Sequence, residues 1–297
     1  MCSSDLRIVM EYMDFKKKDD REVLQLERFP LEKGELPVLH YPLLDACGMV
    51  KHCFTTRGGG ASKGMFESLN LSFTRGDDEA DVQENYARVA SFFGTDKTQF
   101  VCSNQTHTTN VRRVGKEDAG YGVTRPRPYK DVDGLVTDEP GIILSTFYAD
   151  CVPLFFVDPV HRAIGLSHSG WRGTVGRMGA VTLSVMQREF HTRPEDVLAA
   201  VGPSICQDCY EVSEDVADAF YKEFQGHERE ILLEKGNGKY QLDLWKTNEI
   251  ILREAGVIPE HLAVTNICTC CNSRLLFSHR ASHGKRGNLG AFMQIHV

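Results

Sequence analysis

The sequence predicts an α/β fold in which short strands outnumber helices. Three apolar runs stand close together at 142–148, 153–157 and 163–167. Runs of this length, rich in Val, Ile and Phe and bounded by Pro, Gly and Asp, are typical of buried strands. Apolar residues recur at helical spacing over 79–93 and 174–190. Strands and helices are interspersed along the chain, which is the pattern of an α/β protein.

Composition bounds the class of protein. The chain has 297 residues, enough for one large domain or two small ones, and its 41% apolar and 25% charged content is ordinary for a globular protein. The formal net charge of −7 argues against a nucleic-acid-binding protein, which normally has a basic face. No apolar run approaches the roughly 18 residues of a membrane span, and the N-terminus lacks the apolar centre of a signal peptide. We therefore expect a cytoplasmic protein.

The N-terminal third contains several expected elements. Residues 1–30 are expected to be a peripheral arm, because the charged run 16–22 is typical of a solvated segment. A strand at 49–56 leads into a glycine-rich loop at 57–64. The helix at 79–93 carries acidic residues at its start, where the helix dipole favours them.

The middle and the C-terminal part continue this alternation. Strands are expected at 100–102 and 110–114, followed by a polar loop at 115–132 that is long enough to cover a site. No internal repeat, low-complexity tract or linker divides the chain. The remaining expectations are a strand at 197–201, a helix at 214–224, a polar excursion at 227–240, a helix from Asp243 to Ala255, and strands at 262–267, 274–278 and 290–296.

Three reactive side chains stand at or next to the ends of expected strands. They are His107, Cys151 and His168, and sheet pairing would bring them together despite their separation in sequence. Two imidazoles and a thiolate form a borderline-soft donor set suited to Zn²⁺ or, less selectively, to copper. Three protein ligands would leave a fourth position open, as in catalytic zinc sites. The alternative is two ordinary hydrogen-bonded histidines and a buried thiol.

A second group of cysteines competes for a metal. Cys206-x-x-Cys209 and Cys268-x-Cys270-Cys271 resemble the two halves of a zinc ribbon. The second half is irregular, however, and the gap between the halves far exceeds that of a usual ribbon. The spacing therefore favours thiols without a metal over a zinc site.

Two arginines and three acids lie near these motifs. Arg57 opens the glycine-rich loop, and Arg172 lies in a Gly-Trp-Arg-Gly turn at a helix start, where free N–H groups favour an anion. Together they would suit a phosphate. Asp133, Asp150 and Glu211 would serve as general acids or bases, as metal second shell, or simply as loop caps.

The motifs resemble those of the YfiH-like family. The matching segments, in the family's order from about Met49 to the C-terminus, are FTTRGGGASKG, SLNLS, NQTHTTNV, DGLVTD, ADCVPLFFVDP, AIGLSHSGWRGTV, GPSICQDCYEV, ICTC and FSHR. Members of this family were first described as multicopper polyphenol oxidases, or laccases. They were later described as purine nucleoside phosphorylases with adenosine deaminase activity.

The resemblance implies a fold and a site. It implies one catalytic domain over 31–297, a single α/β domain of layered mixed β-sheets flanked by helices, in an α-β-β-α sandwich. It implies metal ligation by His107, Cys151 and His168, with zinc as the usual ion and copper also possible. Arg57, Asn70 and Arg172 fall on motifs near the pocket. At the C-terminus, Arg286-Gly287-Asn288 stands where many members have an Arg after a Thr-Gly pair, so no substrate contact is assigned there.

Four functions remain to be distinguished. The resemblance implies a zinc-dependent phosphorylase of adenosine, inosine or methylthioadenosine that also deaminates adenosine, with phosphate held by arginines and protons handled by Asp133 or Asp150. A copper-dependent phenol oxidase is a second possibility, although none of the 11 histidines forms a His-x-His pair. The others are a metal-free cysteine hydrolase that uses Cys151 and His168 and a nucleoside-binding protein without turnover. Small-molecule substrates and a monomer or homodimer are expected.

Overall fold

The computed structural model describes residues 13–296, and its centre is a pair of six-stranded sheets. The first sheet contains antiparallel pairs and one parallel pair, between β4 and β7. The order of its strands is β1 (Gln25–Pro30), β2 (Glu35–His40), β3 (Val50–Thr55), β15 (Leu289–Ile295), β7 (Ile143–Tyr148) and β4 (Phe100–Cys102).

The second sheet is also mixed. Its edge strands pair in parallel and its central strands are antiparallel. The order of its strands is β14 (Leu262–Val264), β10 (Leu198–Val201), β8 (Val152–Asp158), β9 (Ala163–Ser169), β6 (Gly134–Thr137) and β5 (Val111–Arg113). A small third sheet contains β11 (Glu211–Ser213), β13 (Lys239–Leu242) and β12 (Leu232–Gly236).

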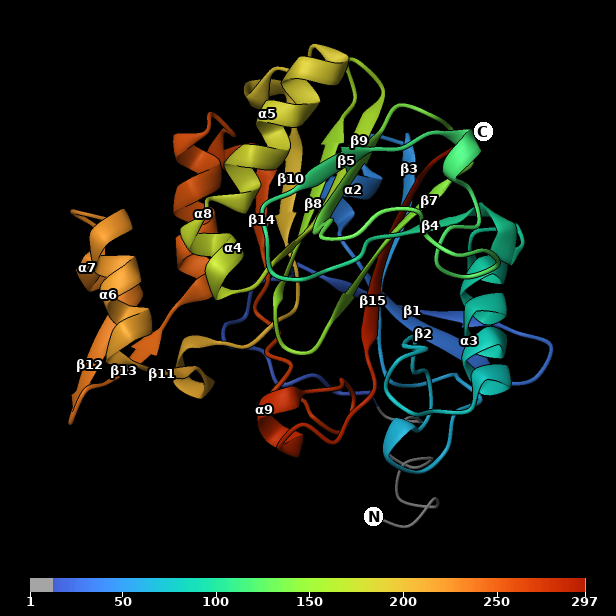
Figure 1. Cartoon of the computed structure of the whole chain (residues 1–297), viewed down its shortest axis with the longest axis horizontal. Helices are drawn as coiled ribbons and strands as arrows, with labels where there is room; N and C mark the ends of the chain where they lie inside the picture. The colour runs from blue at the N-terminus through green and yellow to red at the C-terminus, as the bar shows by residue number, and fades with distance from the viewer. Residues whose placement is uncertain (1–12, 297) are drawn as a thin grey trace.

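Helices cover the outer faces of both large sheets (Figure 1). On the first sheet lies α3 (Glu79–Phe92), and on the second lie α5 (Met178–Phe190) and α8 (Leu244–Glu254). The shorter helices are α2 (Pro42–Asp45), α4 (Trp171–Val175), α6 (Glu214–Glu223), α7 (Glu228–Ile231) and α9 (His279–Ser282).

Three buried clusters correspond to the three spaces between these layers. Leu144, Phe155 and Leu166 belong to the cluster shared by the two large sheets. Other apolar side chains pack α3 on one outer face, and α5 and α8 on the other. The expected layered α/β sandwich is therefore confirmed. Within residues 13–296, no helix has both the length and the apolar character needed to cross a bilayer.

Local sequence explains the main elements. Every residue of β8 is buried, as its continuous apolar sequence predicts. The helix α3 begins after Asp78, whose carboxylate accepts the Ala80 N–H, and α8 begins after Asp243, which accepts from Lys246 N–H.

Three expectations about elements were wrong. The helix expected at 174–190 is divided into α4 and α5, because Arg177 adopts a left-handed φ of 56° between them. The polar stretch 227–240 holds α7, β12 and the start of β13. Residues 274–278 do not form a strand. Their apolar side chains Leu275, Leu276 and Phe277 instead fill the core between the sheets from a turn.

The described part of the N-terminal segment packs against the rest of the fold. Residues 1–12 lie outside the described part, but Gln25–Pro30 forms the edge strand β1. The charged run is exposed, as expected, yet Lys17 forms a β-bridge with Ile267 and Lys18 N–H donates to the Asn266 carbonyl at 2.9 Å. This segment therefore lies against the loop that follows β14.

Candidate metal centre and its pocket

Cys151 lies at the residue where the chain passes from one large sheet to the other. It follows β7 of the first sheet and immediately precedes β8 of the second. In the second sheet Pro153 of β8 is paired with His168 of β9. This register places the thiol beside the imidazole, because adjacent strands are only about 4.8 Å apart.

His107 completes the group from the first sheet. It follows β4 in a loop and adopts a left-handed φ of 68°, which is uncommon for a residue other than glycine. Its Nε2 lies 3.9 Å from Cys151 Sγ, and its ring centroid lies 4.9 Å from that of His168. The nitrogen and sulfur donor atoms of the three residues lie within 4.8 Å of one another.

Asp133 fixes both histidines. Its carboxylate is fully buried and lies 2.8 Å from His168 Nδ1, which leaves Nε2 as that ring's other nitrogen. The same carboxylate accepts the backbone N–H groups of Thr106, His107 and Thr108, each at 3.0 Å. A carboxylate that orients a ligating histidine is a common partner of metal sites.

In the metal-free protein, Cys151, His168 and Asp133 stabilise one another's charged forms. Burial alone would raise the pKa of Cys151, but His168 and His107 lower it to about 6. Burial would lower the pKa of His168, but Cys151 and Asp133 raise it to about 9. Burial opposes ionisation of Asp133 as well, yet His168 and the backbone N–H groups lower the pKa of this acid to about 2. The thiol is therefore a thiolate paired with an imidazolium at neutral pH.

Gly170 leaves room for the group. A Cβ atom at this position would lie 2.9 Å from Cδ2 of His107 and 3.0 Å from Sγ of Cys151. Any side chain here would push against two of the three donors. The site therefore has a steric requirement for glycine just after β9.

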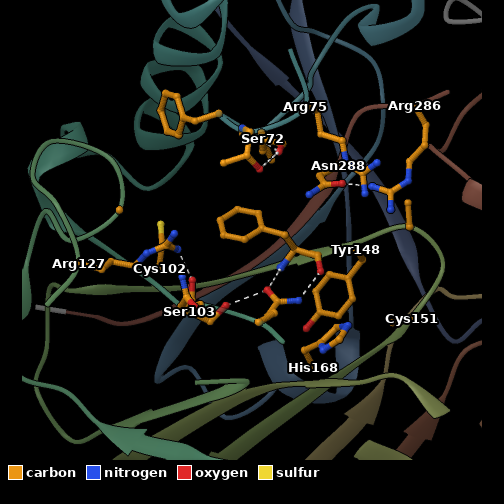
Figure 2. A pocket seen from close by; sticks show the side chains of 18 of the residues that line it. Ser72, Arg75, Cys102, Ser103, Arg127, Tyr148, Cys151, His168, Arg286 and Asn288 are labelled. Atoms are coloured by element: carbon orange, nitrogen blue, oxygen red, sulfur yellow. Dashed lines mark hydrogen bonds between the residues drawn. The ribbon is translucent and has the colours of Figure 1, made fainter. Parts of the chain in front are cut away.

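The three donors open into a pocket of about 350 Å³, within the usual size range of small-molecule sites. Its walls come from both sheets, from the segment 71–75 and from the loop before β15. Figure 2 shows Cys151, Tyr148 and His168 on one side of this space, below Arg75, Arg286 and Asn288. Phe73 and Phe147 supply half-buried aromatic faces.

Three arginines line the same pocket: Arg75, Arg127 and Arg286. Figure 2 places Arg75 and Arg286 together and Arg127 on the opposite side. Arg127 donates to the Ser103 carbonyl, and Arg286 donates to Asn288 Oδ1 and to the Gly287 carbonyl. The buried Nε of Arg286 has no hydrogen-bond partner. The pocket is therefore cationic on the side facing the thiol.

The structure places the sequence-derived anion-binding candidates outside the lining of this pocket. Arg57 donates to the Glu67 and Ser273 carbonyls and stacks on Phe277. Arg172 stacks on the neighbouring Trp171 ring. The buried Asn70 accepts the Ser72 and Asn288 N–H groups, so it supports two wall segments from behind.

The three acidic candidates, Asp133, Asp150 and Glu211, also have partners within the protein. Asp150 accepts from Thr269 Oγ1 at 2.6 Å and from Arg280 N–H at 2.9 Å. Glu211 pairs with Lys235 at 2.9 Å in the small sheet. Asp133 is enclosed by its donors. The geometry of Asp133 and Asp150 is that of residues that position their neighbours.

Sequence reasoning missed Arg75 and Arg127 and assigned no contact to Arg286. Arg127 lies in the polar loop 115–132 that was expected to cover a site. Arg75 follows the SLNLS segment without a motif of its own. Only the juxtaposition of 71–75 with 286–288, joined through Asn70, brings the two arginines together.

The donor set fits a single metal ion. Two imidazoles and a thiolate are suitable zinc donors, Asp133 fixes one ring's orientation, and Gly170 keeps the space between the donors clear. The fourth direction faces the pocket, since all three residues line it. This is the arrangement of an open, reactive site.

The comparisons with known proteins identify the family of this chain. A family model described as "Multi-copper polyphenol oxidoreductase laccase" matches residues 51–296. The chain belongs to this family. It is 38% identical to purine nucleoside phosphorylase YlmD of Geobacillus stearothermophilus, over 80% of this chain and 88% of that protein. It is 33% identical to "Adenosine deaminase RL5" from an unknown prokaryotic organism, over 76% and 86% of the two chains.

A solved protein of similar sequence has the same fold. The crystal structure of Bacillus licheniformis hypothetical protein YfiH superposes with a TM-score of 0.83 at 34% identity, over 86% of this chain and 96% of that one. The resemblance to the YfiH-like family is therefore confirmed.

Proposed function

We propose that this protein is a zinc-dependent purine nucleoside phosphorylase that also deaminates adenosine. The observation that carries the proposal is one pocket in which an open His₂Cys donor set faces a pair of arginines. The names of the curated relatives include both activities. The pocket volume of about 350 Å³ suits a nucleoside-sized molecule.

His107, Cys151 and His168 would hold the zinc ion. When bound, zinc supplies positive charge and one open coordination position at the base of the pocket. Asp133 keeps the His168 ring in place through the 2.8 Å contact to Nδ1, so that Nε2 is the nitrogen left for the metal. We assign Asp133 a positioning role.

Arg75 and Arg286 are proposed to bind phosphate. Burial and, to a smaller extent, the positive charge of Arg75 lower the pKa of Arg286 to about 10. A dianion between the two guanidinium groups would relieve this repulsion and give the buried Nε of Arg286 an acceptor. Arg57 and Arg172, which the sequence suggested for this role, lie outside the pocket lining.

The reaction makes one bond and breaks one. A phosphate oxygen bonds to C1′ of the ribose while the C1′–N9 bond breaks. The bonding electrons remain on the purine, which takes up a proton, and the products are the free base and ribose 1-phosphate. The arginines hold the attacking anion in position, and the half-buried rings of Phe73 and Phe147 would receive the base. Deamination in the same pocket exchanges the C6 amino group of adenosine for the hydroxyl of water and releases ammonia.

A direct assay tests the proposal. Zinc-loaded protein is incubated with adenosine, with and without phosphate, and the products are separated by chromatography. We expect adenine and ribose 1-phosphate only when phosphate is present, and inosine in both cases. Release of neither product from metal-loaded protein would refute the proposal.

A pair of matched variants tests the arginine assignment. Arg75→Gln should raise the KM for phosphate by about tenfold or more, since a charge-assisted contact is lost. Arg172→Gln, which changes an arginine stacked on Trp171 outside the pocket, should leave that KM within about twofold. If the two substitutions changed the KM for phosphate equally, Arg75 would not be the phosphate-binding residue.

A cysteine hydrolase is the second candidate. The His168 imidazole lies next to the Cys151 thiolate and is held by the Asp133 carboxylate, which is the arrangement of a nucleophile, a base and an orienting acid. Metal-free protein would then turn over an ester or amide, and a covalent adduct would form at Cys151. Zinc should abolish this activity, whereas it should activate phosphorolysis. The sign of the zinc effect separates the two functions.

Phenol oxidation has less support from the structure. Multicopper oxidases gather many histidines around several coppers. Within residues 13–296 only one of the two candidate metal-binding groups contains histidine, and it contains two.

A further inference from the structure

Two Cys-x-x-Cys segments meet at one end of the second large sheet. Cys206 and Cys209 follow β10, and Cys268 and Cys271 follow β14. These two strands are parallel neighbours, so the loops after them leave the same edge of the sheet. A parallel bridge between Ser204 and Cys268 continues the pairing into the loops. In the sequence the second pair is hidden, because Cys270 stands between its members.

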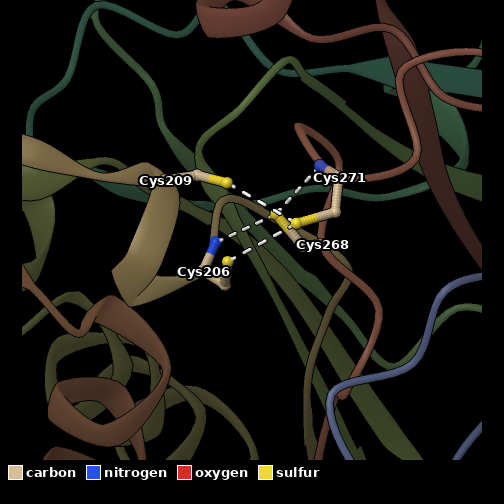
Figure 3. A group of neighbouring side chains, drawn as sticks. All are labelled: Cys206, Cys209, Cys268 and Cys271. Carbon is tan, nitrogen blue, oxygen red and sulfur yellow. Dashed lines mark hydrogen bonds between the residues drawn. The ribbon is translucent and has the colours of Figure 1, made fainter.

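The sulfur atoms have the spacing of a tetrahedral thiolate site. All four lie within 4.8 Å of one another, and Figure 3 shows them converging from the two loops. Cys209 Sγ lies 3.5 Å from Cys271 Sγ, and Cys206 Sγ lies 4.0 Å from it. Four sulfurs at about 2.3 Å from a central zinc would be about 3.8 Å apart. A disulfide, with sulfurs about 2.05 Å apart, does not account for these separations.

Backbone N–H groups are placed to stabilise a thiolate in this group. The N–H groups of Cys206 and Cys271 both point to Cys268 Sγ, at 3.3 Å and 3.4 Å. Lys18 reaches the same loop from the N-terminal segment and pairs with Asp208 at 2.7 Å. Cys206 and Cys268 are buried, and Cys209 and Cys271 are half-buried. Hydrogen bonds to ligand atoms are a common feature of metal sites.

We propose that Cys206, Cys209, Cys268 and Cys271 together bind one zinc ion as a structural site. Four protein thiolates complete a tetrahedral shell and leave no position for substrate. The sulfurs all lie within 4.8 Å of one another, whereas a cluster of several irons distributes its cysteines over more than one metal. The spacing therefore favours one ion. This site is separate from the proposed phosphorylase chemistry.

The zinc would connect two loops that support the reactive pocket. Thr269, inside the second cysteine pair, donates to Asp150, and Ile205 N–H, beside the first pair, donates to the Asp150 carbonyl at 3.1 Å. Asp150 is bonded directly to Cys151 in the chain. A metal that links the two loops would therefore hold the segment carrying the thiol of the open site.

Metal counting on a variant of the open site is the decisive experiment. His107→Ala/His168→Ala removes two ligands there and leaves all four cysteines intact. We expect this full-length variant, purified with zinc, to retain one zinc per chain, with an X-ray absorption shell of four sulfurs at about 2.3 Å. No retained metal, a shell with nitrogen or oxygen, or iron in place of zinc would overturn the proposal.

The reciprocal variant supplies the second measurement. Cys206→Ser/Cys271→Ser should bind one zinc fewer than the unsubstituted protein and should unfold at a lower temperature. Cys47→Ser/Cys270→Ser is the control, because it also removes two thiols, both half-buried, and neither belongs to the group of four. Equal zinc content in the two double variants would overturn the proposal. If Cys206→Ser/Cys271→Ser does not fold, the histidine variant still decides, since its cysteine site is unchanged.

Discussion

The two groups of candidate metal ligands differ in how much of the coordination shell the protein provides. His107, Cys151 and His168 supply three donors at the base of a pocket, so one direction faces the space where a substrate would lie. The four cysteines supply a complete shell between two loops. If both groups bind zinc as proposed, the number of protein donors would separate a site for chemistry from a site for stability.

The groups also differ in how the chain brings them together. The four cysteines come in two short pairs after parallel neighbours, so local spacing and one strand pairing are sufficient. The open set depends on His107 after β4, on the passage of the chain between the sheets at Cys151, and on the β8–β9 register. It is the more sensitive of the two to small displacements.

Asp133→Asn should show this sensitivity most strongly. The amide replaces a buried carboxylate that lies against His168 and accepts three backbone N–H groups. We expect zinc affinity at the open site, measured by chelator competition, to fall about 10–100-fold, with unchanged zinc at the cysteines. Asp131→Asn, at an exposed acid that accepts from Thr106 Oγ1, is the control. A loss of both metals together would show instead that Asp133 serves the fold as a whole.

Gly170→Ala should have the next largest effect. The new Cβ would lie 2.9 Å from His107 Cδ2 and 3.0 Å from Cys151 Sγ, so the donors must move apart. We expect about a tenfold loss of zinc affinity at the open site. Gly173→Ala is the matched control, since its nearest neighbour would lie at 3.5 Å, an ordinary contact. If both variants bind zinc like the unsubstituted protein, the site is less rigid than the steric requirement at 170 indicates.

The pH dependence of Cys151 alkylation tests whether the open site holds a reactive thiolate when no metal is bound. His168 and His107 lower the pKa of Cys151 to about 6 against the opposing effect of burial. The thiolate is the reactive form, so modification of metal-free protein by iodoacetamide should be half-maximal near pH 6 and should reach a plateau above it. Peptide mass spectrometry identifies the modified cysteine, and zinc should protect it. A midpoint near pH 8.5, the value of a free thiol, would contradict the thiolate–imidazolium pair.

Thr269→Val should have the smallest effect, on the connection between the two groups. The substitution removes the 2.6 Å hydrogen bond to Asp150 and leaves the one from Arg280 N–H. We expect the free energy of unfolding to fall by about 1–3 kcal/mol in urea denaturation, with both zinc ions retained. Thr98→Val, at an exposed residue bonded to Asp96, should change it by less than about 0.5 kcal/mol. A Thr269→Val protein as stable as the unsubstituted one would mean that the cysteine loops do not brace Asp150.

The fold could be predicted where burial was complete. The apolar runs that became β7, β8 and β9 have no exposed residue, so composition alone identifies them. The edge strand β1 and the hairpin β12–β13 were missed because their sequences are polar or mixed, and pairing rather than burial stabilises them. The apolar run at 274–278 was misassigned because a buried turn and a buried strand can have the same short apolar sequence.

The site could be predicted only as a set of residue types. The chain order shows that His107, Cys151 and His168 end strands or adjoin their ends, but the distance between them depends on the register of two sheets. Arg75 and Arg286 carry no motif, and their meeting depends on the contact of Asn70 with both segments. The second group of cysteines was judged irregular, and thiols without a metal were favoured, because three cysteines within 268–271 conceal which two belong together.

The passage of the chain at Cys151 has a consequence for assembly. One histidine follows the first sheet, the other ends a strand of the second, and the sulfur lies between them. Neither layer alone presents more than part of the donor set, so a metal ion could be bound by all three donors only after the two layers have packed. Its arrival would mark the completion of folding.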